Sequence, residues 1–350
     1  MITLLKILLL PFSYLFEGVI LLRNLFYDKN VFRSEKVNAK VFSVGNITVG
    51  GTGKTPTVIY LTETLKKIGA KPGILSRGYG RNSKGYRLVF DGKRFLCDVN
   101  ECGDEIILEA RSCNVPAAVS EARTEGARKL IEATKVNAIV LDDAFQHRKI
   151  ARDLDIVLLD ENFLATASFL DKQLLPSGLL REPFASLERA DVVIINRKFN
   201  SPQNIPDKIK RFLKDKNLFY AHYEIDGFYD VKNNERFTAE DFAGQRSLAV
   251  SGIAKPQSFF VSLEKLGIGI TEKLAFRDHK NYAYDDVQLI RKRFYESNAY
   301  SVITTEKDAV KLTNFSKELD DIDIYYLKIR LVIEDEAKFE ELIVSSINGE

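Results

Sequence analysis

A glycine-rich loop between a predicted buried strand and an apolar-periodic helix constrains the fold of this chain more than any other feature. The strand is predicted over residues 40–44 (KVFSV), the loop reads GNITVGGTGKT over 45–55, and the helix continues to about residue 68. Glycines in such a loop let backbone N–H groups close around phosphate oxygens, and the positive end of the helix dipole favours the same negative charge. The pattern therefore predicts a phosphate-binding loop.

The last residues of this loop have the chemistry that a nucleoside triphosphate requires. Lys54 places a positive charge at the β- and γ-phosphates, and Thr55 offers its hydroxyl to Mg²⁺. Thr48 stands where the strict phosphate-loop pattern has glycine, so a purely structural glycine turn is the alternative. The residues expected to bind the nucleotide are Gly50, Gly51, Thr52, Gly53, Lys54 and Thr55.

A second apolar strand, predicted over residues 138–141, ends in two carboxylates, Asp142 and Asp143. The carboxyl ends of parallel strands line one ligand-binding edge of a sheet. We therefore expect both carboxylates to lie near Thr55 and to hold Mg²⁺ directly or through water. A strand followed by a solvated Asp-Asp turn is the alternative.

Short apolar runs alternate with helical stretches along most of the chain, which predicts an α/β fold with a mostly parallel sheet flanked by helices, similar to the P-loop NTPases. The polar stretch 200–240 suggests a domain boundary. An Asp-Gly pair within residues 86–99 predicts a hairpin that projects from the sheet. We predict an apolar membrane-associating helix, a P-loop core and a second, smaller α/β domain, over residues 1–35, 36–225 and 226–350.

Residues 2–27 form the most apolar stretch of the chain and are long enough to span a bilayer as a helix. Pro11 is expected to kink this helix or to divide it in two. A thin polar stripe beside a broad apolar face favours an anchor that lies in the membrane surface, while a transmembrane span and a helix buried in the protein core remain open. No small-residue cleavage site follows, which argues against a signal peptide. The stripe consists of Thr3, Lys6, Ser13, Glu17, Asn24 and Asp28.

The charge composition excludes one class of function. Lysine and arginine number 51 against 49 aspartate and glutamate residues, a formal charge of +2, which gives no support to binding of nucleic acid through a global basic field. Cys97, Cys102 and Cys113 lack metal-site spacing and are expected to be thiols in a reducing cytoplasm, with a zinc site as the alternative.

Seven segments, two of which are the loop and the Asp142–Asp143 strand end described above, closely resemble the tetraacyldisaccharide 4'-kinase family together with the apolar N-terminal helix. They occur in the family's order from the N-terminus to about residue 330. One departure is Ala144, where the family usually has glycine, which is expected to shift the turn after Asp143 slightly. The matching segments are GNITVGGTGKTP (45–56), SRGYGR (76–81), GDE (103–105), LDDAFQH (141–147), LLPSGLLREP (174–183), FRDH (276–279) and TTEKDAVKL (304–312).

The resemblance implies transfer of the γ-phosphate of ATP to the 4'-hydroxyl of a tetraacylated glucosamine disaccharide 1-phosphate in lipid A biosynthesis. It implies a peripheral or monotopic enzyme at the cytoplasmic face of the bacterial inner membrane, with Mg²⁺ but no nucleic acid or obligate protein partner. The implied catalytic residues are Asp104 as general base, His279 as its partner, Lys54 and Arg181. Three further positions, Glu105, His147 and Arg77, match other active-site residues of the family.

Two other functions fit parts of this pattern. A regulatory GTPase or metal-insertion ATPase normally carries an Asn-Lys-x-Asp motif, and Asn196-Arg-Lys-Phe199 lacks its aspartate. A membrane scaffold with a degenerate loop would not need Lys54, Thr55 and the Asp142–Asp143 pair together. A kinase is therefore the function that the sequence favours.

Overall fold

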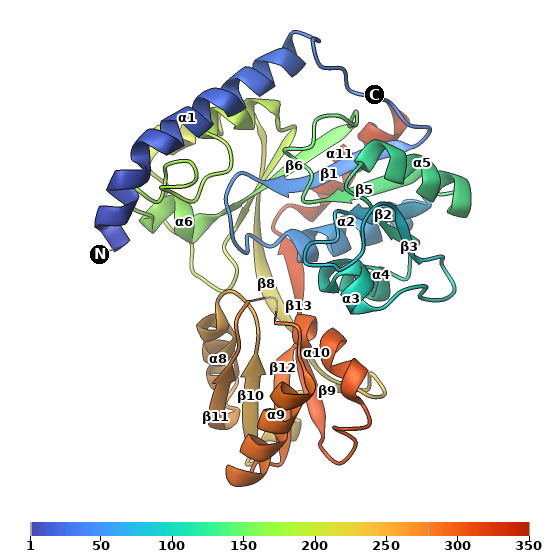
Figure 1. Ribbon diagram of the computed structural model, residues 1–350, viewed down its shortest axis with the longest axis vertical. Helices are drawn as coiled ribbons and strands as arrows, with labels where there is room; N and C mark the ends of the chain where they lie inside the picture. The colour runs from blue at the N-terminus through green and yellow to red at the C-terminus, as the bar shows by residue number, and fades with distance from the viewer. Residues whose placement is uncertain (1, 279, 350) are drawn as a thin grey trace.

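One thirteen-stranded sheet runs through both halves of the computed structural model, which describes residues 2–278 and 280–349 (Figure 1). The upper body in Figure 1 holds the first strands of the chain. Their order from the sheet edge inward is β3 (Arg87–Phe90), β4 (Ala117–Val119), β2 (Pro72–Ser76), β5 (Ala138–Asp142), β1 (Lys40–Asn46), β6 (Leu154–Asp160) and β7 (Val192–Asn196).

The order continues without a break into the lower body. Two long antiparallel strands, β8 and β13, join the two bodies; three further strands of the lower body lie beyond β13, and one short strand pairs with β8. The strands are β8 (Asn217–Asp230) with the short β9 (Arg236–Phe237), then β13 (Ile324–Ile333), β12 (Ser301–Thr305), β10 (Arg246–Ser251) and β11 (Gly269–Ala275).

The central strands are buried on both faces because helices cover them, as their uninterrupted apolar sequences predict. In β1, Phe42 and Val44 join the core beneath α2, whereas Val41 faces the opposite layer with the side chains of α5. The helices of the upper body are α2 (Lys54–Lys67), α3 (Val99–Cys102), α4 (Asp104–Cys113), α5 (Arg123–Thr134), α6 (Glu161–Thr166) and α7 (Asp207–Lys210), and those of the lower body are α8 (Pro256–Lys265), α9 (Tyr284–Glu296) and α10 (Glu306–Leu312). The mixed α/β class with a mostly parallel sheet is confirmed.

The predicted division at residue 225 falls within β8, and the last helix, α11 (Glu336–Asn348), packs on the upper body. Phe339 of α11 is fully buried and makes edge-on ring contacts with Tyr60 of α2 and Phe219 of β8. The C-terminal residues thus return to the body that holds the phosphate loop. The domain boundaries themselves stay a prediction.

The N-terminal helix α1 (Ile2–Asp28) is continuous, so the expected division into two helices at Pro11 is wrong, while the kink stays a prediction. Its polar stripe is fastened to the upper body on both sides of the proline, which holds the helix in one piece despite the missing backbone hydrogen bond. The contacts include Lys6 Nζ to Asp171 at 2.5 Å, Ser177 N to Ser13 Oγ at 2.9 Å, and Asn24 Nδ2 to Glu182 Oε2 at 3.0 Å.

The other side of α1 is apolar and exposed. Only 11% of its most apolar window lies buried inside the protein, which excludes the alternative of a core helix. Leu8, Leu15 and Leu22 are 64%, 69% and 52% exposed. By length and composition the helix could cross a membrane, and an apolar surface of this extent indicates a lipid or protein partner.

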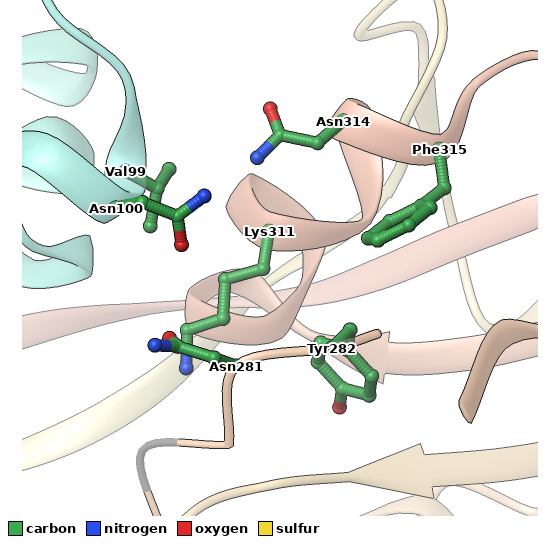
Figure 2. A pocket seen from close by; sticks show the side chains of 7 residues that line it. All are labelled: Val99, Asn100, Asn281, Tyr282, Lys311, Asn314 and Phe315. Atoms are coloured by element: carbon green, nitrogen blue, oxygen red, sulfur yellow. The ribbon is translucent and has the colours of Figure 1, made fainter. Parts of the chain in front are cut away.

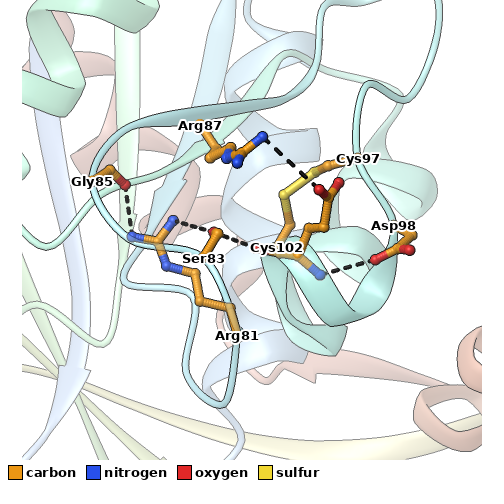
Figure 3. Close-up of a disulfide and its surroundings, with 8 residues drawn as sticks. Arg81, Ser83, Gly85, Arg87, Cys97, Asp98 and Cys102 are labelled. Carbon is orange, nitrogen blue, oxygen red and sulfur yellow. Dashed lines mark hydrogen bonds and ion pairs between the residues drawn. A yellow bond between two sulfur atoms is a disulfide. The ribbon is translucent and has the colours of Figure 1, made fainter.

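Two expectations about residues 86–102 are corrected. The first arm of the predicted hairpin belongs to the main sheet, because β3 pairs with β4 as the edge strand; after the turn at Asp91 the return arm makes an isolated bridge between Phe90 and Phe95, and Leu96 N donates to Val89 O at 2.8 Å. Cys97, which follows the return arm, and Cys102 at the end of α3 form a disulfide and are not the free thiols that were expected (Figure 3). Their Cα atoms lie 6.4 Å apart, within the range that a disulfide spans.

We predict that Phe339→Ala lowers the free energy of unfolding by about 3–5 kcal/mol, because it leaves a cavity between α11, α2 and β8. Urea denaturation followed by circular dichroism measures this loss. Val344→Ala on the same helix is the control, since Val344 is 38% exposed and should change the free energy by less than about 0.5 kcal/mol. Equal effects of both substitutions would contradict the docking of α11 through Phe339.

Candidate active site

The loop between β1 and α2 has the backbone of a phosphate-binding loop. Gly50 and Gly53 adopt φ values of +99° and +104°, which favour glycine, and α2 begins at Lys54. Segment 174–183 runs alongside, because Val49 N donates to Leu179 O at 2.8 Å and Arg181 N donates to Ile47 O at 2.7 Å. The motif that contains Arg181 is therefore placed beside the loop by backbone hydrogen bonds.

The carboxylate of Asp143 contacts two other predicted site residues, Arg181 and Lys54. Arg181 Nη1 lies 2.8 and 2.9 Å from its two carboxylate oxygens, and Lys54 Nζ lies 3.7 Å from Oδ1. Burial raises the pKa of Asp143, but the charges of Lys54 and Arg181 outweigh burial and hold that pKa below its usual range. An ionised carboxylate thus holds both cations at the end of the loop.

The neighbouring Asp142 has a different environment. Its side chain is buried and Ser76 Oγ donates to Oδ2 at 3.0 Å, which brings the end of β2 against the end of β5. Burial, followed by the negative charges of Glu105 and Asp143, raises the pKa of Asp142 to about 7. A cation bound here would reverse that shift and stabilise the ionised carboxylate.

The turn after Asp142 and Asp143 accommodates Ala144, which stands where the family usually has glycine. The left-handed backbone conformation falls on Asp143, with φ +47°, whereas Ala144 does not adopt a positive φ. Ala144 is buried, and its N–H donates to Val44 O at 3.2 Å. The turn therefore does not require a glycine at position 144.

Asp104 and Glu105 open α4 and face the lower body. Lys311 Nζ of α10 lies 2.8 Å from Asp104 Oδ2, and Lys307 Nζ lies 3.0 Å from Glu105 Oε1. Neither lysine is among the site residues predicted from the sequence. The only indication in the sequence was that both lysines lie in the family-like segment TTEKDAVKL (304–312). Neither composition nor spacing shows which carboxylates they contact. His279, the expected partner of Asp104, lies outside the described residues.

A small polar cavity adjoins this contact between the bodies (Figure 2). Its volume is about 90 Å³, and Figure 2 shows side chains from α3 facing others from α10, from the short 3₁₀ turn that follows it, and from the loop at residues 281–282. The cavity is too small for a nucleotide or a sugar ring. It is lined by Val99, Asn100, Asn281, Tyr282, Lys311, Asn314 and Phe315.

His147 and Arg77 lie at the margin of the site. His147 is partly buried, and burial followed by the positive charges of Arg123 and Arg152 lowers its pKa to about 4. Arg77 is exposed directly after β2 and adds to the same positive field. The imidazole of His147 is therefore neutral at pH 7.

The full chain is similar to proteins of known family. The family model described as tetraacyldisaccharide-1-P 4'-kinase matches residues 5–348. A tetraacyldisaccharide 4'-kinase of Chlorobium limicola is 36% identical over 348 residues, covering 97% of both chains, and one of Syntrophus aciditrophicus is 36% identical over 350 residues, covering 97% of this chain and 92% of the relative. The chain belongs to this family.

A solved structure agrees with that assignment. The crystal structure of the "apo" form of LpxK from Aquifex aeolicus in complex with ATP at 2.2 Å resolution superposes with a TM-score of 0.82 at 32% identity, covering 98% of this chain and 99% of that one. The resemblance stated from the sequence motifs is confirmed. The activity is that of a tetraacyldisaccharide 4'-kinase in lipid A biosynthesis.

We predict that His147 contributes to the loss of stability of this family member in mild acid. The pKa of His147 is lowered from 6.5 to about 4 in the folded protein, so unfolding takes up a proton between these pH values and stability falls as the pH falls. His147→Gln removes that contribution. The free energy of unfolding, measured in urea between pH 7 and pH 4.5, should therefore fall less steeply in the variant. Parallel curves for the two proteins would contradict the neutral, buried state of the imidazole.

Proposed function

We propose that the loop at residues 50–55 binds the triphosphate of ATP and that the γ-phosphoryl group passes to the 4'-hydroxyl of a tetraacylated glucosamine disaccharide 1-phosphate. The observation that carries this proposal is the junction at Asp143, where Lys54 and Arg181 present two positive charges at the start of α2. Phosphoryl transfer depends on such positioned charge, because negative charge accumulates on the transferred group. The whole-chain relative from Aquifex aeolicus, which is in complex with ATP, supports the choice of nucleotide.

The donor set at this end of the sheet fits Mg²⁺ bound together with a nucleotide. Among the described residues no three His, Cys, Asp or Glu side chains are grouped to hold a metal ion by themselves. Mg²⁺ in kinases is usually held by one or two protein oxygens together with phosphates and waters, so a full protein cage is not required. We assign Asp142 and Thr55 to the metal. Asp143 is better suited to orienting Arg181 and Lys54, since Arg181 contacts both of its oxygens.

We assign Asp104 as the general base that accepts the proton of the 4'-hydroxyl, with His279 as its partner. The oxygen of that hydroxyl forms a bond to the γ-phosphorus while the bond between that phosphorus and the β–γ bridging oxygen breaks, leaving ADP. A carboxylate is a weak base, but a loose transition state requires little proton transfer early in the reaction. Lys311 of α10 contacts Asp104, so the position of this base depends on how the lower body sits against α4.

We propose a peripheral or monotopic position at the cytoplasmic face of the inner membrane. Lys6, Ser13 and Asn24 fasten α1 along the upper body, and a helix that crossed the bilayer would have to give up contacts of this kind. The opposite, apolar side remains available to lipid. An acylated substrate leaves the bilayer at a cost of about 0.8 kcal/mol per exposed CH₂ group, so the enzyme has to act at the interface.

The assignment of Lys54 and Asp104 predicts large losses of activity. With ATP, Mg²⁺ and the disaccharide 1-phosphate in mixed micelles, Lys54→Met should lower kcat about 10²–10³-fold and Asp104→Asn about 10²–10⁴-fold. His279→Ala tests the partner of the base in the same assay. Lys67→Met, at the other end of α2, and Asp207→Asn, whose side chain is 95% exposed, are matched controls that should retain activity. Full activity of Asp104→Asn would reject it as the base.

The exposed side of α1 predicts membrane binding that can be separated from catalysis. Replacing Leu8, Leu15 and Leu22 together by glutamine leaves the polar stripe intact and should release the protein from vesicles of phosphatidylethanolamine and phosphatidylglycerol in a flotation assay. Nucleotide binding in solution should not change. A triple control replaces three exposed residues of the lower body by glutamine, namely Val261, Tyr295 and Tyr300. Unchanged flotation of the α1 variant would contradict the interfacial assignment.

A further inference from the structure

The turn after β7, whose sequence Asn196-Arg-Lys-Phe199 lacks the aspartate of the GTPase motif, contacts the predicted phosphate loop. Asn196 is the last residue of β7 and its side chain is fully buried. Its Nδ2 donates to Thr52 O at 3.0 Å and to Tyr223 Oη of β8 at 3.0 Å. The side-chain amide of Asn196 therefore connects the loop to β7 and β8, which lie on the far side of β6 from the loop.

Lys198 makes the second contact from the same turn. Its Nζ donates to Gly51 O at 2.7 Å and pairs with Asp160 Oδ2 at 2.5 Å, and its side chain is only 20% exposed. Asp160 is itself held in place, because its other oxygen accepts from Phe163 N at the start of α6. The ammonium group thus connects the loop to a fixed carboxylate.

The turn has a defined geometry. Lys198 adopts a left-handed backbone conformation with φ +56°, its N–H donates to Asn196 Oδ1 at 2.8 Å, and its carbonyl accepts from Tyr223 N at 2.9 Å. Asn196 therefore uses both ends of its side-chain amide, one toward the loop and one toward its own turn. A turn held in this way can fix the loop without help from a ligand.

Asn196 and Lys198 both donate to backbone carbonyl groups of the loop, and these bonds affect which way the N–H groups of the same peptide units point. In a phosphate loop the N–H groups point toward the phosphate, so the carbonyls of the same peptide units point away and need partners inside the protein. Asn196 and Lys198 supply those partners at Thr52 and Gly51. Asn46 of β1 adds a bond to the Thr52 side chain, from Nδ2 to Oγ1 at 2.8 Å.

Gly53 is matched to the same turn. A Cβ atom at this position would lie 2.3 Å from Asn196 Nδ2 and 2.5 Å from Tyr223 Oη, and both distances are too short. The glycine before Lys54 is thus required by the close approach of Asn196 and Tyr223 as well as by its φ of +104°. Loop and turn are built to fit one another.

We propose that Asn196 and Lys198 are positioning residues that hold the phosphate loop in its nucleotide-binding conformation before ATP arrives. The proposal rests on the proposed function of the loop and adds two residues to it. Neither side chain is assigned a contact with the substrate. Their effect is on nucleotide affinity, because a loop that must be ordered on binding binds more weakly.

The experiment measures ATP affinity and kinetics in full-length variants. Asn196→Asp keeps the shape of the side chain but replaces the donor by a carboxylate that repels Thr52 O, and Lys198→Met removes the ammonium group. Each should raise the Kd for a non-hydrolysable ATP analogue with Mg²⁺, measured by calorimetry, by about tenfold or more. The KM for ATP should rise in parallel, while the KM for the acylated disaccharide stays within about twofold.

Matched controls separate positioning of the loop from general stability. Asn200→Asp changes an asparagine of the same turn that bonds only Arg197 O among the described residues, and Lys216→Met removes a lysine that donates to the carbonyls of Glu188 and Ala190, away from the loop. Both controls should leave the Kd for the ATP analogue unchanged. Lys198→Arg should restore most of the affinity that Lys198→Met loses.

The outcomes distinguish this proposal from the proposed function. If the wild-type protein binds the ATP analogue and both Asn196→Asp and Lys198→Met bind it equally well, the positioning role is wrong while the kinase assignment stands. If the KM values for both substrates rise together with a lower melting temperature, the two residues serve only the fold and the proposal is overturned. If the wild-type protein does not bind the analogue, the proposed function of the loop fails and this inference fails with it.

Discussion

The contact between the Asp143 carboxylate and two cations organises the candidate site. Arg181 approaches both oxygens of Asp143 and Lys54 approaches one of them, so three segments that are far apart in the sequence are held by one ionised group. A partly buried carboxylate can carry its charge here only because both cations are close. Backbone hydrogen bonds place segment 174–183 beside the loop, and the contact with Asp143 then orients the charges of Arg181 and Lys54 toward each other.

Segment 174–183 also links the site to the N-terminal helix. Arg181 contacts Asp143, while the next residue, Glu182, is fully buried and accepts hydrogen bonds from Asn24 of α1 and from Arg189. Ser177 of the same segment binds α1 near Ser13. The helix with the exposed apolar side is therefore connected to the phosphate loop through one short stretch of chain. This arrangement fixes the position of the site relative to the exposed apolar side of α1.

The site also depends on the lower body. Lys307 and Lys311 of α10 meet Glu105 and Asp104 at the start of α4, and β8 with β13 forms the continuous connection between the two bodies. The Asn196–Lys198 turn sits against Tyr223 of β8 as well. Both the carboxylate assigned as base and the loop assigned to the nucleotide are thus in contact with elements that bridge the bodies.

The local features of this arrangement could be predicted from the sequence, but the long-range contacts could not. Strand and helix periodicity located the phosphate loop and the strand before Asp142, because both are set by residues close in sequence. Strand β8 was missed, since its half-buried side chains give no clear alternation. The pairing of Lys311 with Asp104, the return of α11 to α2, the unbroken helix at Pro11 and the Cys97–Cys102 disulfide all depend on tertiary contacts that no local pattern encodes.

Hydrogen–deuterium exchange with and without a non-hydrolysable ATP analogue and Mg²⁺ tests the central claim, which is that the triphosphate lies on the amides before Lys54. The account predicts slower exchange at residues 49–55, because those N–H groups bind phosphate oxygens in the complex. Peptides from α8 and α9, far from the loop, should exchange at the same rate in both states. Unchanged exchange at 49–55, with protection elsewhere in the chain, would contradict the account.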